Sequence, residues 1–248
     1  MADDSRVPRI HVVTLFPEVL APYLGASIIG RAVERHRVEF GLVQIRDFAT
    51  DRHRTVDDQP YGGGAGMVLK PEPLVAAVES IEDRGRVVVM SARGRRFDHS
   101  LAVRLSLEPR LTIVCGHYKD IDQRVIDVLG AEEVSFGDFV LTGGEPAALC
   151  LIDAVVRLLP GVLGDHESAS SDSFYDGLLS PPSYTRPPEF RGLVVPDVLR
   201  SGNHAEIEAW REREAERMTA ERRPEVWAAW KQAHEEGGSH GPSVDVDP

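Results

Sequence analysis

The sequence predicts an α/β protein in which a mostly parallel β-sheet occupies the first two-thirds of the chain and a small helical part follows. Short apolar segments alternate with amphipathic segments from residue 10 to residue 159, the pattern of strands connected by helices. The segment 86–90 (RVVVM) is apolar after its first residue, as in a strand covered on both faces. With 248 residues, 42% of them hydrophobic and 27% charged, the chain can form one large domain and a smaller one.

The individual elements follow from the local periodicity. Apolar runs predict strands at 10–15, 38–45, 86–90, 111–115, 133–136 and 139–141. Amphipathic spacing predicts the intervening helices at 27–36, 71–81, 100–107, 121–129 and 146–159. Pro71 suits the first turn of its helix, where no backbone N–H is needed.

The pattern changes after residue 160. Residues 161–171 are rich in Gly, Ser, His and Asp and lack periodicity, whereas 181–188 (PPSYTRPP) is kept extended by its prolines. Two more helices are expected at 203–218 and 224–233. We therefore expect a sheet domain at 1–163, a flexible linker or lid at 164–171, a helical C-terminal domain at 172–234 and a disordered acidic tail at 235–248.

Charge and composition exclude several classes of protein. The net charge of −12 opposes a general nucleic-acid coat, so any nucleic acid has to meet a local basic patch. The longest uncharged run, residues 19–30, is too short for a membrane span, which needs about 20 residues. The acidic opening MADD is unlike a signal peptide, and the 2 cysteines cannot form a disulfide framework. We expect a cytoplasmic protein with no membrane partner.

Three expected strand ends share one feature, an apolar strand followed by glycine or other small residues. They are 90–94 (MSARG), 114–118 (VCGHY) and 135–144 (SFGDFVLTGG). Because ligands of α/β proteins bind at the carboxyl ends of strands, these loops could converge on one flat ligand. Each loop taken singly is an ordinary tight turn. The glycine cluster 61–66 (YGGGAG) is not a P-loop, and its spacing alone is typical of a flexible surface loop.

The sequence lacks the usual signatures of metal sites and hydrolases. It contains no HExxH, CxxC or GxSxG motif, and its 9 histidines are scattered. Cys115, at an expected strand end, is more typical of a small core residue than of a nucleophile. We predict no metal ligands from the sequence.

Several long motifs nevertheless resemble those of one family, and they occur in the same order. They are VVTLFPEVL (12–20), PYGGGAGM (60–67), CGHYKDIDQRV (115–125), SFGDFVLTGGE (135–145), LIDAVVRLLPGVLG (151–164), DSFYDGLLSPPSYTRP (172–187) and PDVLRSGNHAEIEAWR (196–211). The family is that of the bacterial tRNA (guanine-N1)-methyltransferases, the TrmD family of the SPOUT class. The resemblance covers about residues 9–232.

The resemblance implies a fold, a reaction and its partners. The parallel sheet would carry a deep trefoil knot, a rare exception to the rule that chains do not thread loops. The enzyme would be a homodimer that methylates N1 of guanosine 37 of tRNA, next to the anticodon, which protects the reading frame. S-adenosylmethionine would be the methyl donor, and Mg²⁺ a further expected cofactor. The donor would be held by Met90, Ser91, Ala92, Gly94, Gly116, Tyr118, Lys119, Ser135, Phe136, Gly137, Phe139, Leu141, Gly143 and Gly144.

Two residues match the catalytic positions of the family. N1 of guanine carries a proton at neutral pH, so a base has to remove it as the methyl group is transferred. Asp172 matches the catalytic aspartate and would be this base. Arg157 matches the arginine that stabilises the charge on O6 or orients the guanine. Without the resemblance, Asp172 reads more readily as the cap of a turn or helix.

Other residues depart from the family pattern. His117-Tyr118-Lys119-Asp120 stands where Arg-Tyr-Glu-Gly is usual, so Lys119 reverses the sign of a charge near the sulfonium unless it points outward or pairs with Asp120 or Asp122. Ser180 replaces an aspartate, which would weaken magnesium dependence if that acid helps to hold the ion. Ala65 replaces a proline in the glycine cluster.

These departures keep two alternatives open. One is a related knotted methyltransferase that acts on another RNA. The other is a homologue that binds RNA or a nucleotide without catalysis, which Lys119 and Ser180 would suggest.

Overall fold

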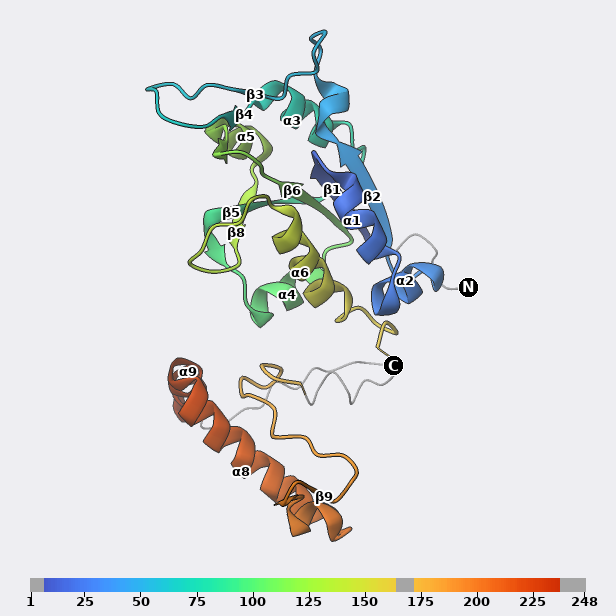
Figure 1. The fold of residues 1–248 in the computed structure, drawn as a ribbon, viewed down its shortest axis with the longest axis vertical. Helices are drawn as coiled ribbons and strands as arrows, with labels where there is room; N and C mark the ends of the chain where they lie inside the picture. The colour runs from blue at the N-terminus through green and yellow to red at the C-terminus, as the bar shows by residue number, and fades with distance from the viewer. Residues whose placement is uncertain (1–6, 164–171, 237–248) are drawn as a thin grey trace. The chain divides into compact units, whose positions relative to one another are not determined.

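The computed structural model describes residues 7–163 and 172–236. The chain divides into two compact units, Met1–Gly164 and Asp165–Pro248, and each is described by itself (Figure 1). The predicted linker at 164–171 lies outside the described residues, as does the predicted tail at 235–248 from residue 237 onward. Residues 235 and 236 form the end of a helix, so the prediction of disorder is wrong for these two.

The first unit is built on a five-stranded sheet with the order β2-β1-β6-β5-β8. Every neighbouring pair in this sheet is parallel. The central pairing joins distant parts of the chain, because Arg9 lies opposite Arg110. The strands are β1 (Arg9–Thr14), β2 (Glu39–Gln44), β5 (Arg86–Arg96), β6 (Arg110–Cys115) and β8 (Glu132–Ser135).

Helices cover both faces of this sheet, so strand residues alternate between two cores. Ile113 of β6 belongs to one core together with residues of α1, α2, α4 and α6, whereas Val114 belongs to the other, together with residues of α3 and α5. Figure 1 shows these two groups of helices on opposite sides of the strands. The helices are α1 (Pro17–Leu24), α2 (Ser27–Glu34), α3 (Pro71–Glu79), α4 (His99–Ser106), α5 (Gln123–Leu129) and α6 (Glu145–Val156).

The prediction of a parallel α/β sheet is confirmed, and two of its local details are wrong. Residues 139–141 form no strand; they lie in a loop with Phe139, Val140 and Leu141 56%, 86% and 44% exposed. Helix α1 was not predicted, because Phe16-Pro17 reads as the end of a strand. Pro17 instead occupies the first turn of α1.

Strand β5 is longer than predicted because it resumes after a bulge. Met90 lies opposite Val134, and Arg95 lies opposite the same Val134 after a register shift. Residues 91–94 therefore leave the sheet and return to it. Gly94 makes the return possible, since a Cβ there would overlap the backbone of Glu133 and Val134.

A second, smaller sheet of the first unit has the order β3-β4-β7. Its strands are β3 (Asp57–Asp58), β4 (Val68–Leu69) and β7 (Asp120–Ile121). The glycine cluster lies in the connection between β3 and β4, and Gly62, Gly63, Gly64 and Gly66 all have positive φ. The amide of Lys119 donates to the carbonyl of Met67 at 2.9 Å, so this sheet joins the glycine cluster to the segment that follows β6.

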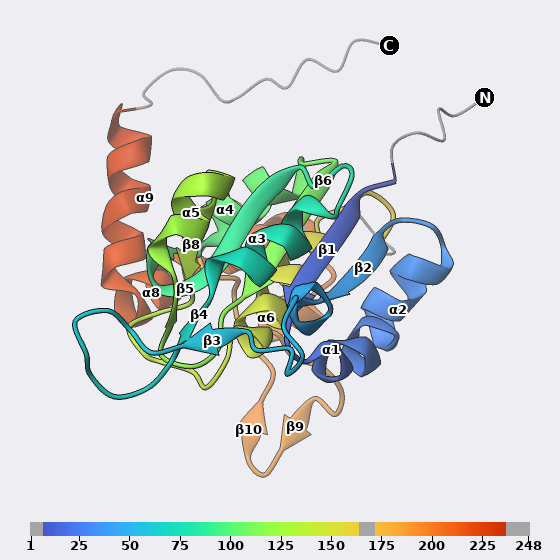
Figure 2. The same ribbon diagram turned by 90° about the horizontal axis from the view of Figure 1, so that it is seen from above.

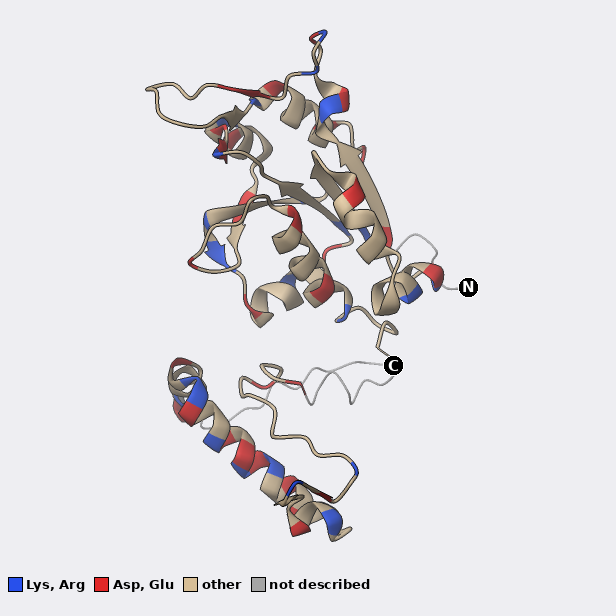
Figure 3. Cartoon of the chain, viewed as in Figure 1, with Lys and Arg blue, Asp and Glu red and all other residues tan. Residues whose placement is uncertain are grey.

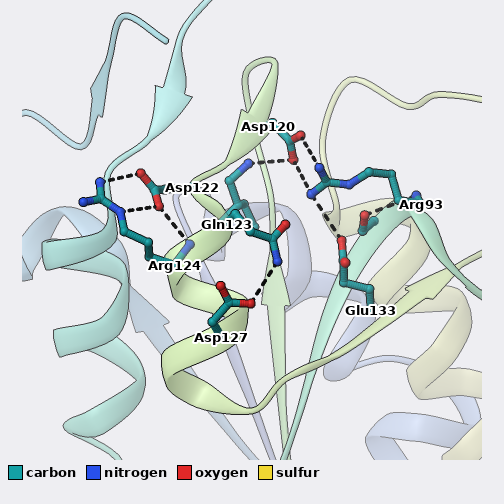
Figure 4. Close-up of polar contacts among 9 residues, drawn as sticks. Arg93, Asp120, Asp122, Gln123, Arg124, Asp127 and Glu133 are labelled. Carbon is teal, nitrogen blue, oxygen red and sulfur yellow. Dashed lines mark hydrogen bonds and ion pairs between the residues drawn. The ribbon is translucent and has the colours of Figure 1, made fainter. Parts of the chain in front are cut away.

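The N-terminus of helix α5 is capped by Asp122, and the carboxylate of this residue pairs with Arg124. The Asp122 carboxylate accepts from the backbone N–H of Arg124 at 2.9 Å and forms two bonds with its guanidinium (Figure 4). The side-chain bond from Arg124 is the main cause of a lowered pKa of Asp122, against a smaller opposing effect of burial. A lowered pKa stabilises the fold above the ordinary value of 3.8, and this stabilisation is lost as the pH falls through the folded-state pKa.

Removing this cap should therefore have a pH-dependent effect. We expect Asp122→Ala to lower the free energy of unfolding by about 1 kcal/mol at pH 7, the usual cost of losing a cap. The difference from wild type should shrink below pH 3.8, where the carboxylate becomes protonated. Urea denaturation at pH 7 and at acidic pH measures both values. Asp127→Ala, an exposed position on the same helix, is the control and should change stability little at either pH.

The second unit contains a short hairpin and two helices. The hairpin pairs β9 (Glu189–Phe190) with β10 (Leu193–Val194) and is seen clearly in Figure 2. The helices are α8 (His204–Arg222) and α9 (Pro224–Glu236). Both were predicted, and α8 extends beyond residue 218. Among the described residues, no helix is long and apolar enough to cross a membrane.

Candidate functional site

The first unit contains a cavity at the carboxyl ends of three adjacent strands, β6, β5 and β8. Its volume is about 290 Å³, near the lower end of the range for small-molecule sites, roughly 300–1,000 Å³. The three predicted loops line it, because neighbouring parallel strands end at the same edge of a sheet. Of the residues predicted to bind a donor, all line the cavity except Gly94 and Gly137.

The loop that follows β8 reaches the cavity through close backbone contacts. The N–H of Gly144 donates to the carbonyl of Gly116 at 2.8 Å. A Cβ on Gly144 would lie 2.8 Å from Cα of Cys115 and 2.9 Å from N of Gly116. Two segments that both line the cavity therefore cross with no side chain between them.

A buried carboxylate supports this crossing. Glu145 is 3% exposed, accepts from the Thr14 hydroxyl at 2.5 Å and contacts Nε2 of His117 at 2.9 Å. Gly143 fits between His117 and Glu145, and a Cβ there would overlap both side chains. Burial raises the pKa of the Cys115 thiol well above its ordinary value, and the charge of Glu145 adds to the rise. Cys115 is therefore a core residue, and it is not activated as a nucleophile.

One wall of the cavity carries a three-residue ion-pair cluster. The Arg93 guanidinium, from the bulge of β5, lies 3.2 Å from Asp120 Oδ2 and 3.4 Å from Glu133 Oε1 (Figure 4). The cluster joins the bulge to β7 and β8. Its net charge is negative, because two carboxylates meet one guanidinium.

Of the two arrangements considered for Lys119, pairing with Asp120 or Asp122 does not occur. Asp120 pairs with Arg93, and Asp122 pairs with Arg124. The Lys119 side chain instead packs along the glycine cluster, where a Cβ on Gly64 would lie 3.3 Å from Nζ and a Cβ on Gly66 would lie 3.3 Å from Cβ of Lys119.

The two predicted catalytic residues belong to different units. Arg157 follows the last residue of α6, and Gly144, at the cavity, precedes the first. Helix α6 has 12 residues and is therefore about 18 Å long. Arg157 thus lies at the far end of α6 from the cavity of its own chain.

Asp172 lies at the start of a loop in the second unit. Its carbonyl accepts from the N–H of Tyr175 at 3.3 Å, so it begins a turn. The loop is closed where Ser180 meets Ser173: the two hydroxyls are 2.9 Å apart, and the N–H of Ser180 donates to Oγ of Ser173 at 2.9 Å. The serine that replaces the usual aspartate thus closes this loop.

The sequence did not indicate several residues of the site. Thr14, His117 and Glu145 meet although 131 positions separate the first from the last. Arg93 stands in the predicted loop 90–94, but nothing in the sequence indicated its two carboxylate partners, which come from separate strands. Glu145 ends the motif SFGDFVLTGGE (135–145). An acidic residue at the start of an apolar helix is a signal that could have indicated its buried role.

Basic side chains are interleaved with acidic ones on the C-terminal helices, as Figure 3 shows. On α8, Arg217 pairs with Glu214 at 2.7 Å and with Glu221 at 2.9 Å, and Arg211 pairs with Glu208 at 3.4 Å. These arginines are partly neutralised, so α8 presents no uniformly basic face.

Residues 7–163 and 172–236 contain no group of three or more His, Cys, Asp or Glu side chains that could hold a metal ion. We therefore assign no step to Mg²⁺.

Comparison with known proteins gives a consistent result. Residues 8–229 match the family described as tRNA (Guanine-1)-methyltransferase TrmD. A protein of Anaeromyxobacter sp. (strain K) is 54% identical over 225 residues, which cover 89% of this chain and 91% of the relative. Proteins of Geobacter sulfurreducens and Exiguobacterium sibiricum are each 55% identical, and each match covers 88% of this chain and 90% of the relative. All three relatives bear the name tRNA (guanine-N(1)-)-methyltransferase.

Proposed function

The chain belongs to the tRNA (guanine-1)-methyltransferase TrmD family, and from this premise we propose that it transfers the methyl group of S-adenosylmethionine to N1 of guanosine 37 in tRNA. Methylation of guanine N1 in tRNA is the activity that the family and its relatives carry. The observation that supports the proposal best is the cavity at the ends of β6, β5 and β8, which three glycine-containing loops enclose.

The residues of the cavity suit S-adenosylmethionine. When bound, this donor supplies an electrophilic methyl group on a sulfonium cation. Asp120 and Glu133 outnumber Arg93 on one wall, and their negative charge favours a cation there; Lys119, which also lines the cavity, brings the formal charge of the whole lining to zero. Gly116, Gly143 and Gly144 line the cavity without side chains, and Ile121 and Leu141 offer apolar surface to an adenine. We assign Met90, Ser91 and Ala92 to the same site.

The contacts around Gly144 support the trefoil knot of the SPOUT class. Gly144 and Gly116 pack backbone against backbone, and α6 continues directly from this crossing into the core. Threading the chain here places two donor-binding loops side by side without an intervening side chain.

Asp172 and Arg157 fit the chemistry at guanine. An ionised carboxylate can accept the N1 proton, which leaves as the methyl group is transferred. The electrons left on N1 delocalise onto O6, where a permanently charged guanidinium such as Arg157 stabilises them. The protein would gain most of its rate from holding these groups in line with the donor.

The position of Arg157 supports a homodimer with shared active sites. About 18 Å of helix α6 separates Arg157 from the cavity of its own chain. An arginine at that distance cannot reach a guanine beside the donor, whereas the cavity of a second copy is a suitable target. We assign tRNA binding to the helical C-terminal unit, residues 172–234.

The proposal is tested with the full-length protein, labelled S-adenosylmethionine and two tRNA transcripts. One transcript has guanosine at position 37 and the other has adenosine there. We expect label to enter the guanosine transcript alone and to be recovered as N1-methylguanosine after digestion to nucleosides. Equal labelling of both transcripts would exclude the proposed target. Labelling of ribosomal RNA in place of either tRNA would favour the related methyltransferase considered above.

A further inference from the structure

The loop that follows Asp172, residues 173–180, is fastened to helix α8 of the same unit by one buried hydroxyl. The N–H of Leu179 donates to Oγ1 of Thr219 at 2.9 Å. The Thr219 hydroxyl in turn donates to the carbonyl of Ala215 at 2.6 Å. Thr219 is 0% exposed, so water cannot replace either bond.

Thr219 is a polar residue at a fully buried position of helix α8. Helix α8 is rich in charged residues, and its buried residues are Ala215 and Thr219. These two are four residues apart and therefore lie on one face of the helix. An apolar side chain of the same shape would fill this space equally well. The hydroxyl is needed because the loop brings a backbone N–H to a site from which water is excluded.

Helix α9 and Arg223, the residue that follows α8, also contact the loop. Gly177 has φ +87°, and a Cβ there would lie 3.0 Å from Cδ1 of Trp230. Trp230 is itself stacked between Trp227 and His234, with ring centroids 5.1 Å and 3.9 Å away. The Arg223 guanidinium lies 5.7 Å from the centre of the Phe174 ring. The loop is therefore held at several points by the two C-terminal helices.

These contacts reach Asp172 through the internal bonds of the loop. The N–H of Phe174 donates to the carbonyl of Leu178 at 2.6 Å, and Ser173 joins Ser180, the residue after Leu179. The Leu179–Thr219 bond thus lies next to the closure of the loop, and Asp172 directly precedes Ser173. A shift of Leu179 would move Ser180 and Ser173, and with them the carboxylate.

We propose that Thr219 is a positioning residue, whose buried hydroxyl fastens the loop at Leu179 and so sets the direction of the Asp172 carboxylate. This inference rests on the proposed role of Asp172 as the base. It gives the C-terminal helices a part in the chemical step in addition to RNA binding.

Three variants of the full-length protein test the proposal. Thr219→Val keeps the branched shape and removes the hydroxyl, whereas Thr219→Ser keeps the hydroxyl. Gly177→Ala pushes the loop away from Trp230 without touching Thr219, and it serves as a second test if Thr219→Val fails to fold. The measurements are the single-turnover rate of tRNA methylation at saturating donor, the Kd of S-adenosylmethionine by calorimetry, and the melting temperature.

We expect Thr219→Val and Gly177→Ala to slow methyl transfer roughly 10–100-fold, the usual effect of misplacing a reacting group by about 1 Å. The Kd of the donor should not change, because its cavity lies in the first unit. Thr219→Ser should stay within about twofold of wild type, since its hydroxyl can accept the same bond. A folded Thr219→Val with the wild-type rate would overturn the inference, and so would a Thr219→Ser as slow as Thr219→Val.

Asp172→Ala, measured alongside, separates the two proposals. If that variant is inactive while a folded Thr219→Val is fully active, the positioning inference fails and the role of Asp172 survives. If Asp172→Ala keeps the wild-type rate, the assignment of the base itself fails, and the role of Thr219 fails with it.

Discussion

Replacing Asp172 by alanine is expected to slow methylation of tRNA roughly 10²–10⁴-fold, the usual contribution of a positioned general base. The physical reason is that N1 of guanine keeps its proton at neutral pH, and alanine cannot accept it. Binding of S-adenosylmethionine should be unchanged, because the described residues that line the cavity all belong to the first unit. Single-turnover methylation and calorimetry on the same preparation measure the two quantities.

A second aspartate of the same unit provides the control. The Asp197 side chain is 98% exposed, so Asp197→Ala should leave both the transfer rate and donor binding near their wild-type values. Asp172→Asn should be almost as slow as Asp172→Ala, because the amide keeps the shape of the side chain and loses its basicity. A rapid Asp172→Asn would show that the side chain orients the substrate and does not act as the base.

Replacing Gly144 by alanine is expected to weaken binding of S-adenosylmethionine strongly. The new Cβ would lie 2.8 Å from Cα of Cys115 and 2.9 Å from N of Gly116, and neither backbone atom can turn aside as a flexible side chain could. Overpacking of this kind costs about 1–3 kcal/mol, or roughly 5–150-fold in Kd if the whole cost falls on the bound form. Calorimetry measures Kd, and thermal unfolding reports any part of the cost that falls on the fold itself.

The expected loss of donor binding in Gly144→Ala comes from steric overlap and not from backbone strain. Gly144 has φ −77° and ψ −16°, which alanine adopts readily. Gly25→Ala is the matched control, since Gly25 also borders a helix, has φ −90° and would place its Cβ an ordinary 3.6 Å from the carbonyl oxygen of Ala21. An unchanged Kd and melting temperature in Gly144→Ala would contradict this prediction, because they would mean that the backbones at Gly144 and Gly116 can move apart at little cost.

The sequence predicts the sheet well where a strand is covered on both faces. The segments 86–90 and 111–115 are apolar apart from Arg86 and Thr112, and both lie in interior strands of the sheet. Residues 139–141 carry the same apolar signal and form no strand. Their side chains line a cavity open to solvent, and an apolar residue that faces a ligand is not distinguishable by composition from one that faces a core.

The loops of the candidate site were predicted from the strand ends and from the resemblance, whereas the contacts that support these loops were not predicted. The motifs around Gly116 and Gly144 predict loops that line the cavity, because each motif is contiguous in sequence. The bonds of Glu145 to Thr14 and His117, and of Thr219 to Leu179, join positions that share no local pattern. Only the packed structure brings such residues together, so a reading of local periodicity cannot find them.

The pairing of β1 with β6 has a consequence for synthesis of the protein. Arg9 meets Arg110, so β1 leaves the ribosome about 100 residues before this partner, a delay of roughly 5–20 s at the usual rate of translation. Its other neighbour, β2, emerges much sooner. Throughout that interval, one edge of β1 has no hydrogen-bonding neighbour. We therefore expect the nascent chain to bind chaperones until β6 has been translated.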